Sequence, residues 1–450
     1  NIGHVTNGVH YYTWTSPIWQ KLYRETFGAD FEKNQPVAKA WSKINTIPDE
    51  KIWNKRLELK SNLIVELKKK LKKDLTAKAE NPKMIINMIS KLDEKALIIG
   101  FARRFATYKR AHLLFTNLDR LEAIINKKNK PVFFVFSGKA HPNDTAGQDL
   151  IKRIVEISKM PQFVGKILFI DNYDMTIGKL LTSSVDIWLN TPTRPLEASG
   201  TSGEKAVMNG VVNFSVLDGW WAEGYLPNAG WAIEENRTYE NQYFQDELDA
   251  ETIYSTLENE ISKIYYKQDF NGVSTKWVAH IKKTISKIAP HFTMQRMLED
   301  YYSQFYSKLF DRRKLMYSNG YEKAKEVVNW KKHILECWPN MSVDTVDMPD
   351  VNKGPVEFGT NFNAEIILNM AGLDCNDIGV EILMGNKEDE EVKKLAFKME
   401  LDGENMGDNK AKYVCNFPLK HTGVHDYIFR IFPKNSLLAY RMDFPLVNWV

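Results

Sequence analysis

Short apolar segments alternate with longer amphipathic segments between residues 96 and 219. The short segments have the composition of buried strands, and the longer ones repeat apolar residues at the spacing of a helix that packs on a sheet. This alternation predicts a doubly wound α/β unit with a parallel sheet. The predicted strands are residues 97–101, 132–137, 167–171, 185–190 and 211–216, and the predicted helices between them include 109–126 and 149–160.

The pattern changes on both sides of this unit. Residues 50–78 are predicted to form a helix whose lysine and glutamate side chains make a solvated face, and residues 250–335 to form several further helices. After Trp338 apolar and polar positions alternate between turn residues, which predicts antiparallel strands. We therefore expect two domains, residues 1–335 and 340–450. The strands predicted in the second domain are 364–370, 379–384, 395–401, 413–418 and 426–432.

The composition narrows the class of protein. The 450 residues carry a net charge of +4, are 43% hydrophobic and 26% charged, and include no acidic or basic tail, which argues against a nucleic-acid partner. The longest apolar runs are far shorter than the roughly 20 residues of a membrane helix. Three cysteines without a CxxC pair predict a reducing cytoplasm, with no disulfide framework and no metal site. The chain begins at Asn1 without Met, and we expect it to be a piece of a longer protein.

Polar segments follow the predicted strands, where an open parallel sheet binds its ligands. Residues 102–110, after the first strand, contain four cations that form either a solvated basic turn or an anion site. The fourth strand is followed by a loop of small residues and a short helix with Lys205 in its first turn. This loop is either a tight turn with a solvated lysine or a cradle of N–H groups for a phosphate. In the second case Lys205 neutralises charge or forms a Schiff base with a phosphorylated aldehyde such as pyridoxal phosphate.

Five sequence motifs occur in order along the chain, at residues 3–10, 104–110, 138–142, 186–192 and 197–205. Together they resemble the bacterial short-chain branch of the α-glucan phosphorylases, glycosyltransferase family 35. The resemblance implies an α/β fold, the Rossmann-like C-terminal lobe of a GT-B glycosyltransferase with helical flanks, followed by a small antiparallel β-domain of unknown role. It also implies reversible phosphorolysis of α-1,4-glucan to glucose 1-phosphate, with retention of configuration and with pyridoxal phosphate as cofactor.

The resemblance also implies roles for residues at the matched positions. Lys205 matches the lysine that binds pyridoxal phosphate covalently, and the phosphate of that cofactor is expected to exchange a proton with substrate phosphate. Arg104 and Lys109 match cations that bind substrate phosphate, and with Lys205 they are the expected catalytic residues. The other expected contacts to the cofactor are Tyr173, Thr201, Ser202 and Gly203, and the expected contacts to the sugar are Asn7, Glu197, Ala198, Ser199 and Gly200.

Two features depart from the family pattern. Met usually precedes the cofactor lysine, whereas Glu204 stands there; its carboxylate could oppose a phosphate, but we expect it to point outward. The N-terminal lobe of the family is missing, so we expect the chain alone to bind the cofactor weakly or not at all and to be nearly inactive. Its expected partners are that lobe, α-1,4-glucan, inorganic phosphate, glucose 1-phosphate and a second copy in a homodimer.

Two other functions stay open. One is a sugar-nucleotide-dependent GT-B glycosyltransferase similar to glycogen synthase, in which an acidic residue and a glycine after the fourth strand hold the donor. The other is a non-catalytic glucan-binding module, formed by exposed aromatic side chains of the β-domain. A cofactor bound through Lys205 would distinguish the phosphorylase from both alternatives.

Overall fold

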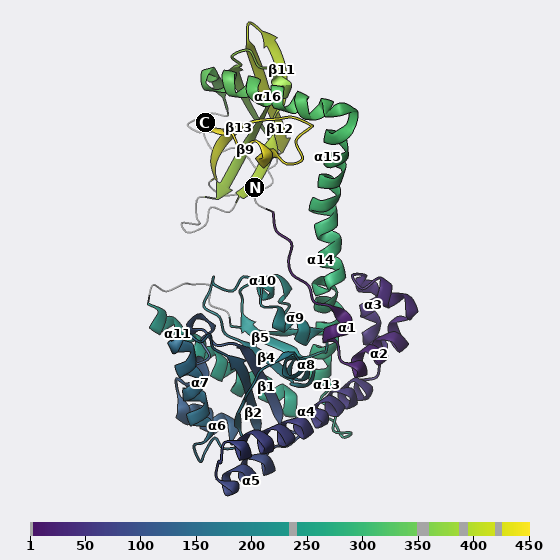
Figure 1. Cartoon of the computed structure of the whole chain (residues 1–450), viewed down its shortest axis with the longest axis vertical. Coiled ribbons are helices and arrows are strands. Elements are labelled where there is room, and N and C mark those ends of the chain that lie inside the picture. Colours follow the sequence, from purple (N-terminus) through teal and green to yellow (C-terminus); the bar gives the residue numbers. More distant parts are fainter. Residues whose placement is uncertain (1–2, 234–240, 349–359, 387–394, 419–424) are drawn as a thin grey trace. The chain divides into compact units, whose positions relative to one another are not determined.

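A parallel sheet of six strands organises residues His4–Asp300, one of two units into which internal contacts divide the chain. The second unit contains Tyr301–Val450 together with Asn1–Gly3. The computed structural model describes residues 3–233, 241–348, 360–386, 395–418 and 425–450. Figure 1 labels the helices and strands of both units.

The sheet of the first unit confirms the five predicted strands and adds a sixth. Its order is β3-β2-β1-β4-β5-β6, and all neighbouring strands are parallel. The order reverses between β1 and β4, and such a switch point is where open parallel sheets bind ligands. The sequence pattern misses β6 because four residues that begin with a glycine carry too short an apolar signal. The strands are β1 (Leu97–Arg104), β2 (Val132–Lys139), β3 (Ile167–Ile170), β4 (Ile187–Asn190), β5 (Val212–Val216) and β6 (Gly230–Ile233).

Helices lie on both faces of this sheet (Figure 1), as expected for a doubly wound unit. The predicted helix at 50–78 is confirmed as α4. The α-helices are α1 (Tyr11–Trp14), α2 (Pro17–Phe27), α3 (Ala38–Trp41), α4 (Asp49–Ala77), α5 (Pro82–Ser90), α6 (Leu118–Ile125), α7 (Thr145–Ser158), α8 (Met175–Ser184), α9 (Thr201–Val207), α10 (Trp220–Gly224), α11 (Gln242–Thr256), α12 (Ser262–Tyr266), α13 (Thr275–Lys283) and α14 (Met294–Tyr301).

The predicted helix at 109–126 is wrong in its first half. Two short 3-10 turns occupy that half, and Arg110 between them has a φ of 48°, in the left-handed region that interrupts a helix. The α-helix begins after Asn117, whose side chain accepts a hydrogen bond from the N–H of Arg120. Helix α7 likewise begins earlier than predicted, because the Asp144 carboxylate caps its first turn. Side-chain caps therefore decided both helix starts.

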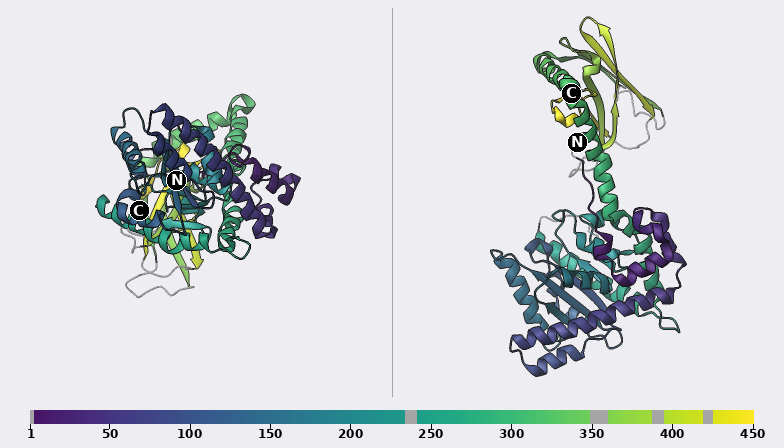
Figure 2. Two further views of the ribbon diagram at one scale, coloured as in Figure 1. Left: turned by 90° about the horizontal axis from the view of Figure 1, so that it is seen from below. Right: turned by 45° about the vertical axis from the view of Figure 1, so that its right-hand side comes forward.

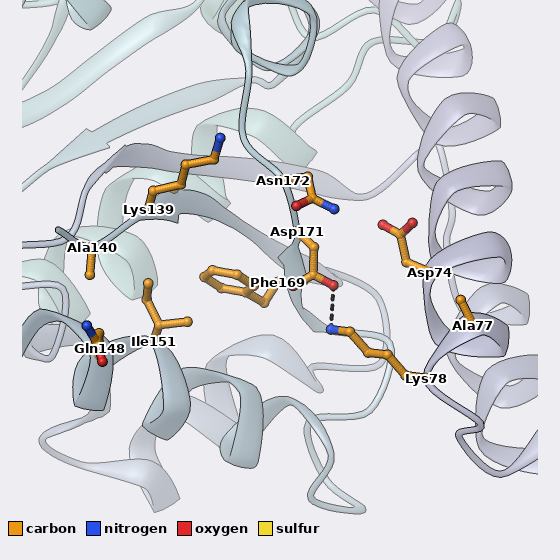
Figure 3. A pocket seen from close by; sticks show the side chains of 11 residues that line it. Asp74, Ala77, Lys78, Lys139, Ala140, Gln148, Ile151, Phe169, Asp171 and Asn172 are labelled. Atoms are coloured by element: carbon orange, nitrogen blue, oxygen red, sulfur yellow. Dashed lines mark hydrogen bonds and ion pairs between the residues drawn. The ribbon is translucent and has the colours of Figure 1, made fainter. Parts of the chain in front are cut away.

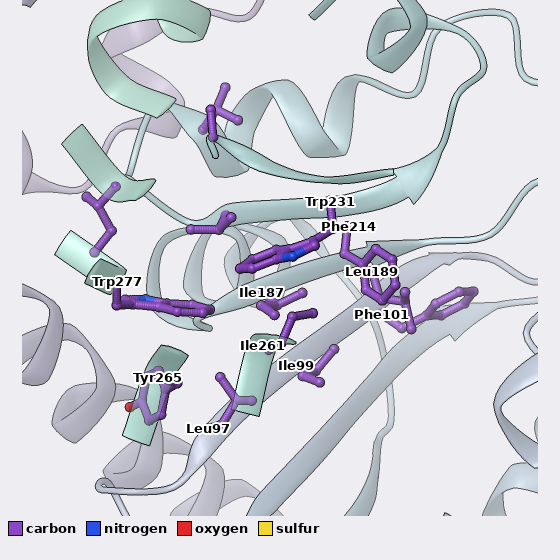
Figure 4. Packing of buried hydrophobic residues seen from close by; sticks show 14 of the residues in the cluster. Leu97, Ile99, Phe101, Ile187, Leu189, Phe214, Trp231, Ile261, Tyr265 and Trp277 are labelled. Atoms are coloured by element: carbon purple, nitrogen blue, oxygen red, sulfur yellow. The ribbon is translucent and has the colours of Figure 1, made fainter. Parts of the chain in front are cut away.

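Two apolar clusters pack on opposite faces of the sheet. Along β1, Leu97, Ile99 and Phe101 join one cluster, whereas Ile98 and Ala102 join the other. Figure 4 shows the first cluster, in which aromatic side chains from later in the chain pack with the strand residues. Burial on both faces explains why the strands read as continuous apolar segments rather than as alternating ones.

One polar cluster interrupts this core. Asp186 immediately precedes β4 and is buried, where it accepts a hydrogen bond from the N–H of Ile98 at 2.9 Å. The same carboxylate pairs with the ammonium of Lys60 at 2.9 Å. Lys60 and Arg56 belong to α4 and are both buried, so the predicted solvated face does not include every charged residue of that helix.

The second unit combines helices with two antiparallel sheets (Figure 2). The sheet orders are β10-β9-β13-β14 and β11-β12-β8-β7, and residues such as Ile366 and Ile382 from different sheets share one apolar core. All five predicted strands are confirmed. The pattern misses β7 and β11, which have no buried residue, and the two-residue β14. The elements are α15 (Ser307–Tyr317), α16 (Glu322–Cys337), β7 (Ser342–Asp347), β8 (Asn361–Asn369), β9 (Ile378–Asn386), β10 (Leu395–Glu400), β11 (Asp402–Gly407), β12 (Lys410–Pro418), β13 (His425–Pro433) and β14 (Asn448–Trp449).

Helix α16 packs with these sheets. Ile334 belongs to their core, and the indole N–H of Trp330 donates to Asp377 at 2.7 Å. The contact boundary at residue 301 consequently lies earlier than the change of sequence pattern at Trp338. The division into a catalytic part, 1–335, and a β-domain, 340–450, stays a prediction. All three cysteines are free thiols, and no helix in the described ranges is long and apolar enough to span a bilayer.

Candidate active site at the carboxyl ends of β1 and β4

A buried carboxylate between two cations marks the switch point of the sheet. Glu197, in the loop after β4, accepts a hydrogen bond from Arg103 Nη2 at 2.8 Å and pairs with Lys109 Nζ. Arg103 lies at the end of β1, and Lys109 lies in the turn that follows it. Glu197 and Lys109 are only 7% and 6% exposed, so Lys109 does not belong to a solvated basic turn, one of the two alternatives for residues 102–110.

This cluster carries an unbalanced positive charge. Arg103 leaves its Nε and Nη1 groups buried without a hydrogen-bond partner among the described residues. Burial lowers the pKa of the Arg103 guanidinium, whereas the Glu197 carboxylate raises it. Buried donors that lack partners are costly, and an anion would satisfy them. The arrangement therefore favours an anion site over a purely structural ion pair.

Arg103 is a site residue that the sequence prediction missed. Its neighbour Arg104, predicted to be catalytic, is exposed. Successive side chains of a strand point to opposite faces, so the two arginines cannot both face Glu197. The alternation of side chains along β1 could have indicated Arg103, because it follows Ile99 and Phe101 on the same face of the strand. The predicted role of Arg104 stays a prediction.

The fold brings together two predicted sugar contacts that lie far apart in the sequence. Asn7 Nδ2 donates a hydrogen bond to Ser199 Oγ at 3.0 Å. Gly200 has a φ of 83°, which a glycine adopts without strain, and this bend carries the chain from Ser199 into α9. The backbone carbonyl of Ser199 accepts the N–H of Trp220 at 2.9 Å. The Ser199 side chain is thus held on a hydrogen-bonded backbone segment.

Lys205 lies on α9 with its ammonium 3.9 Å from the ring centroid of Trp14. Burial lowers the pKa of this amine, and neighbouring Glu204 raises it. No carboxylate of the described residues forms an ion pair with it. A half-buried amine with a lowered pKa and no counter-ion is chemically suited to attack an aldehyde.

The other predicted cofactor contacts have observable neighbours. Ser202 Oγ accepts the indole N–H of Trp188 at 3.1 Å. A Cβ at Gly203 would lie 2.5 Å from the Trp220 side chain, so this glycine is required for packing. Tyr173 is half-buried beside α8, and burial raises the pKa of its hydroxyl. Thr201 is the first residue of α9, and Ala198 lies in the loop before it.

Glu204 contradicts the expectation that it points outward. Its side chain is fully buried, and neither carboxylate oxygen makes a hydrogen bond of good geometry with the described residues. Burial raises the pKa of this carboxyl to about 7, although Arg296, Lys205 and the Ser199 hydroxyl lower it. A helix position that looked solvent-facing is closed off by the packing around α9.

Two family models match the chain. Residues 1–223 match the model for carbohydrate phosphorylases, and residues 338–450 match the glycogen phosphorylase C-terminal domain. The chain belongs to the carbohydrate phosphorylase family. The two matches take in both the cluster around Glu197 and the antiparallel sheets.

Curated relatives of the same phosphorylase family align with the chain. Maltodextrin phosphorylase of Thermococcus litoralis is 36% identical over 99% of this chain and 52% of its own length. Glycogen phosphorylase of Aquifex aeolicus is 42% identical over 68% of this chain and 44% of its own length. Glycogen phosphorylase of Mycobacterium bovis is 31% identical over 99% of this chain and 51% of its own length. The chain therefore spans about half the length of the curated relatives it matches.

A cavity of about 630 Å³ opens at the carboxyl ends of β2 and β3, the strands that follow β1 in the sheet order. Figure 3 shows Phe169 and Lys139 at this cavity, with Lys78 donating to Asp171 at 2.5 Å. None of the predicted site residues lines it. The polar cluster at β1 and β4 therefore remains the candidate active site.

Proposed function

We propose that the chain is the cofactor-bearing half of an α-glucan phosphorylase, which catalyses the reversible phosphorolysis of α-1,4-glucan to glucose 1-phosphate with retention. One observation supports the proposal most directly. The Glu197 carboxylate lies between Arg103 and Lys109, in the loop that joins β4 to the helix of Lys205, and β4 pairs with β1. The names of the maltodextrin and glycogen phosphorylases among the relatives support the same reaction. The proposal includes a GT-B architecture, a cytoplasmic location and a homodimer, which rest on the resemblance and the cysteine content.

In this reaction the cations would hold phosphate. Lys109 and the unpaired donors of Arg103 supply positive charge at the end of β1, and exposed Arg104 is proposed to join them. Two phosphate groups in contact repel strongly in a site without water unless fixed cations lie around them. Asn7, Ser199, Glu197 and the backbone of Ala198 and Gly200 would bind the glucosyl hydroxyls, and the buried carboxylate fixes the orientation of the sugar.

The residues present fit pyridoxal phosphate. The Lys205 amine has no ion-pair partner in the described part of the chain, and the Ser202 and Thr201 hydroxyls lie on the same short helix. We propose that Lys205 binds the aldehyde, with Tyr173, Thr201, Ser202 and Gly203 around the cofactor. When bound, the cofactor would supply a phosphate group that donates and accepts a proton during phosphorolysis.

Borohydride reduction tests the cofactor assignment directly. The intact enzyme is incubated with pyridoxal phosphate, reduced, and digested, and a pyridoxyl adduct on the Lys205 peptide is expected by mass spectrometry. Lys205→Arg is the matched control and should give no adduct there. Turnover of UDP- or ADP-glucose by the intact enzyme without the cofactor would instead establish the sugar-nucleotide glycosyltransferase.

Activity assays of the intact enzyme and of this chain alone test whether the N-terminal lobe is needed. We expect phosphorolysis of maltodextrin by the intact enzyme and almost none by these 450 residues alone. Robust phosphorolysis by the chain alone would contradict this expectation. Binding of maltodextrin by residues 340–450 alone would revive the glucan-binding module.

A further inference from the structure

The Lys205 ammonium has an aromatic partner in place of a counter-ion. Its nitrogen lies 3.9 Å from the ring centroid of Trp14, and no carboxylate of the described residues forms an ion pair with it. The face of an indole ring attracts a cation, and the attraction grows where the pair is partly removed from water, as both side chains are here. The proposed function gives a role to Lys205 but none to Trp14.

One buried amide fixes the backbone of both residues. Asn209 is fully buried, and its Nδ2 donates to the Trp14 carbonyl at 2.8 Å and to the Lys205 carbonyl at 2.9 Å. Its Oδ1 accepts the N–H of Ser16 at 2.7 Å, so both ends of the amide are held. The ring and the ammonium therefore meet on a hydrogen-bonded backbone, although they lie far apart in the sequence.

Glu204 is the charged residue that acts on Lys205. Adjacent positions of a helix do not face each other, and neither Glu204 oxygen makes a well-formed hydrogen bond within the described residues. Burial lowers the pKa of the Lys205 amine, and the charge of Glu204 raises it.

The elements that pack on α9 carry further titratable side chains, Lys179, Glu223, Lys287 and His291. The acid among them, Glu223, accepts the hydroxyl proton of Thr6 at 2.6 Å. Among the described residues, the Trp14 ring is thus the partner that contacts the ammonium directly.

We propose that Trp14 is a positioning residue, whose ring holds the protonated Lys205 amine in one place and delays the loss of its proton. The link to the cofactor rests on the proposed function, whereas the pair of ring and ammonium does not. A carboxylate in the place of the ring would bind the ammonium more tightly and would repel the phosphate groups that the proposed reaction brings to this site. The uncharged ring fixes the amine without either effect.

The ring also affects the pH at which Lys205 becomes available. An amine is a nucleophile only after it has given its proton to solvent, and the ring stabilises the ammonium form over the neutral form. Removal of the ring should therefore lower the pKa of the Lys205 amine still further. More of the neutral amine should then be present at neutral pH.

Competitive acetylation measures this change without the cofactor and without an activity assay. The 450-residue chain is treated with a trace of acetic anhydride between about pH 6 and 11, and the midpoint of Lys205 acetylation is read by mass spectrometry. We expect Trp14→Leu to raise the neutral fraction of Lys205 at neutral pH by about 3- to 10-fold. Trp14→Phe should raise it less, because phenylalanine keeps a ring.

Phe310→Leu is the control for the loss of a ring beside another lysine. The centroid of the Phe310 ring lies 4.6 Å from Lys314 Nζ, and its removal should leave the Lys205 midpoint unchanged. A Lys205 midpoint that stays the same or rises in Trp14→Leu would overturn the proposal. If leucine prevents folding, as judged by circular dichroism, a wild-type midpoint in Trp14→Phe would overturn it instead.

Reconstitution of the intact enzyme tests the link to the cofactor. Cofactor-free enzyme is mixed with pyridoxal phosphate between about pH 6 and 9, and the rate of covalent incorporation is followed by absorbance. We expect the midpoint of this pH profile to be lower in Trp14→Leu by the same amount as in the acetylation experiment. Equal profiles would overturn the role of Trp14 toward the cofactor. A shifted acetylation midpoint without any incorporation into the wild-type enzyme would support the ring–ammonium pair and reject the proposed function.

Discussion

Two buried ionic clusters border the same sheet and differ in how completely their hydrogen bonds are made. Around Asp186, Arg56 donates to the carbonyls of Ser183, Asn209 and Val185, and Lys60 donates to Asp186, the Ala96 carbonyl and the Tyr265 hydroxyl. Neither cation leaves a buried nitrogen without a partner among the described residues.

The cluster around Glu197 is built from the same types of residue but is incomplete. Arg103 makes one hydrogen bond to Glu197 and leaves Nε and Nη1 unpaired within the described ranges. A buried network whose hydrogen bonds are all made stabilises the core around it. A buried network with missing partners can bind a ligand that supplies them. The number of hydrogen bonds left unmade, rather than burial or charge, separates the structural cluster from the candidate functional one.

Breaking the structural cluster should have the largest effect. Asp186→Asn leaves the buried Lys60 without its counter-charge, and the free energy of unfolding is expected to fall by about 3–5 kcal/mol. Urea denaturation of the chain measures this change. The control is Asp171→Asn, whose partner Lys78 is half exposed, and it should cost less than about 1 kcal/mol. Equal losses of unfolding free energy in the two variants would show that the complete hydrogen bonding of the Asp186 cluster adds nothing to stability.

Breaking the incomplete cluster should affect catalysis instead of stability. In the intact enzyme, Arg103→Ala is expected to lower kcat/KM for phosphorolysis by about 10²- to 10³-fold, because the proposed fixed donor to the phosphate is lost. Its free energy of unfolding should change by no more than about 1 kcal/mol, since Glu197 keeps Lys109. Arg120→Ala removes a cation whose ion pairs within the described residues are with Glu251 and Glu258, and it should leave kcat/KM unchanged. If Arg103 had only a structural role, Arg103→Ala would lower the free energy of unfolding and leave kcat/KM unchanged.

Glu204 extends the comparison to a buried carboxyl that lacks a well-formed hydrogen bond among the described residues. The buried carboxyl keeps its proton up to about pH 7, whereas in the unfolded chain it ionises near 4.5. The native state therefore binds more protons between these values, and the wild-type chain loses stability as the pH rises through this window. Glu204→Gln cannot ionise and does not lose stability in this way. The free energy of unfolding of the variant, relative to the wild-type chain, should therefore rise from near zero below about pH 4.5 to about 3 kcal/mol at pH 8. Denaturation curves at the two ends of the window measure it, and a gain that is equal at both would contradict a buried, proton-holding carboxyl.

Much of the fold could be predicted from the sequence. The five strands of the parallel sheet between Leu97 and Val216 carry dense apolar segments, and hydrophobic burial acts on those positions in almost any packing. Features decided by one or two hydrogen bonds were predicted less well, as at Arg110 and Asn117, where a left-handed residue and a cap split the expected helix. Strands without a buried face, such as β7 and β11, leave no periodic signal.

The sequence by itself determined which chemical groups this chain carries. The order of its motifs identified the family, Lys205 and the loop from Glu197 to Gly203. Only the tertiary structure decided how those groups meet. It paired Asn7 with Ser199, turned Arg103 rather than Arg104 toward Glu197, and closed Glu204 off from water. Such contacts join residues far apart along the chain, so they depend on how the elements pack rather than on the local pattern.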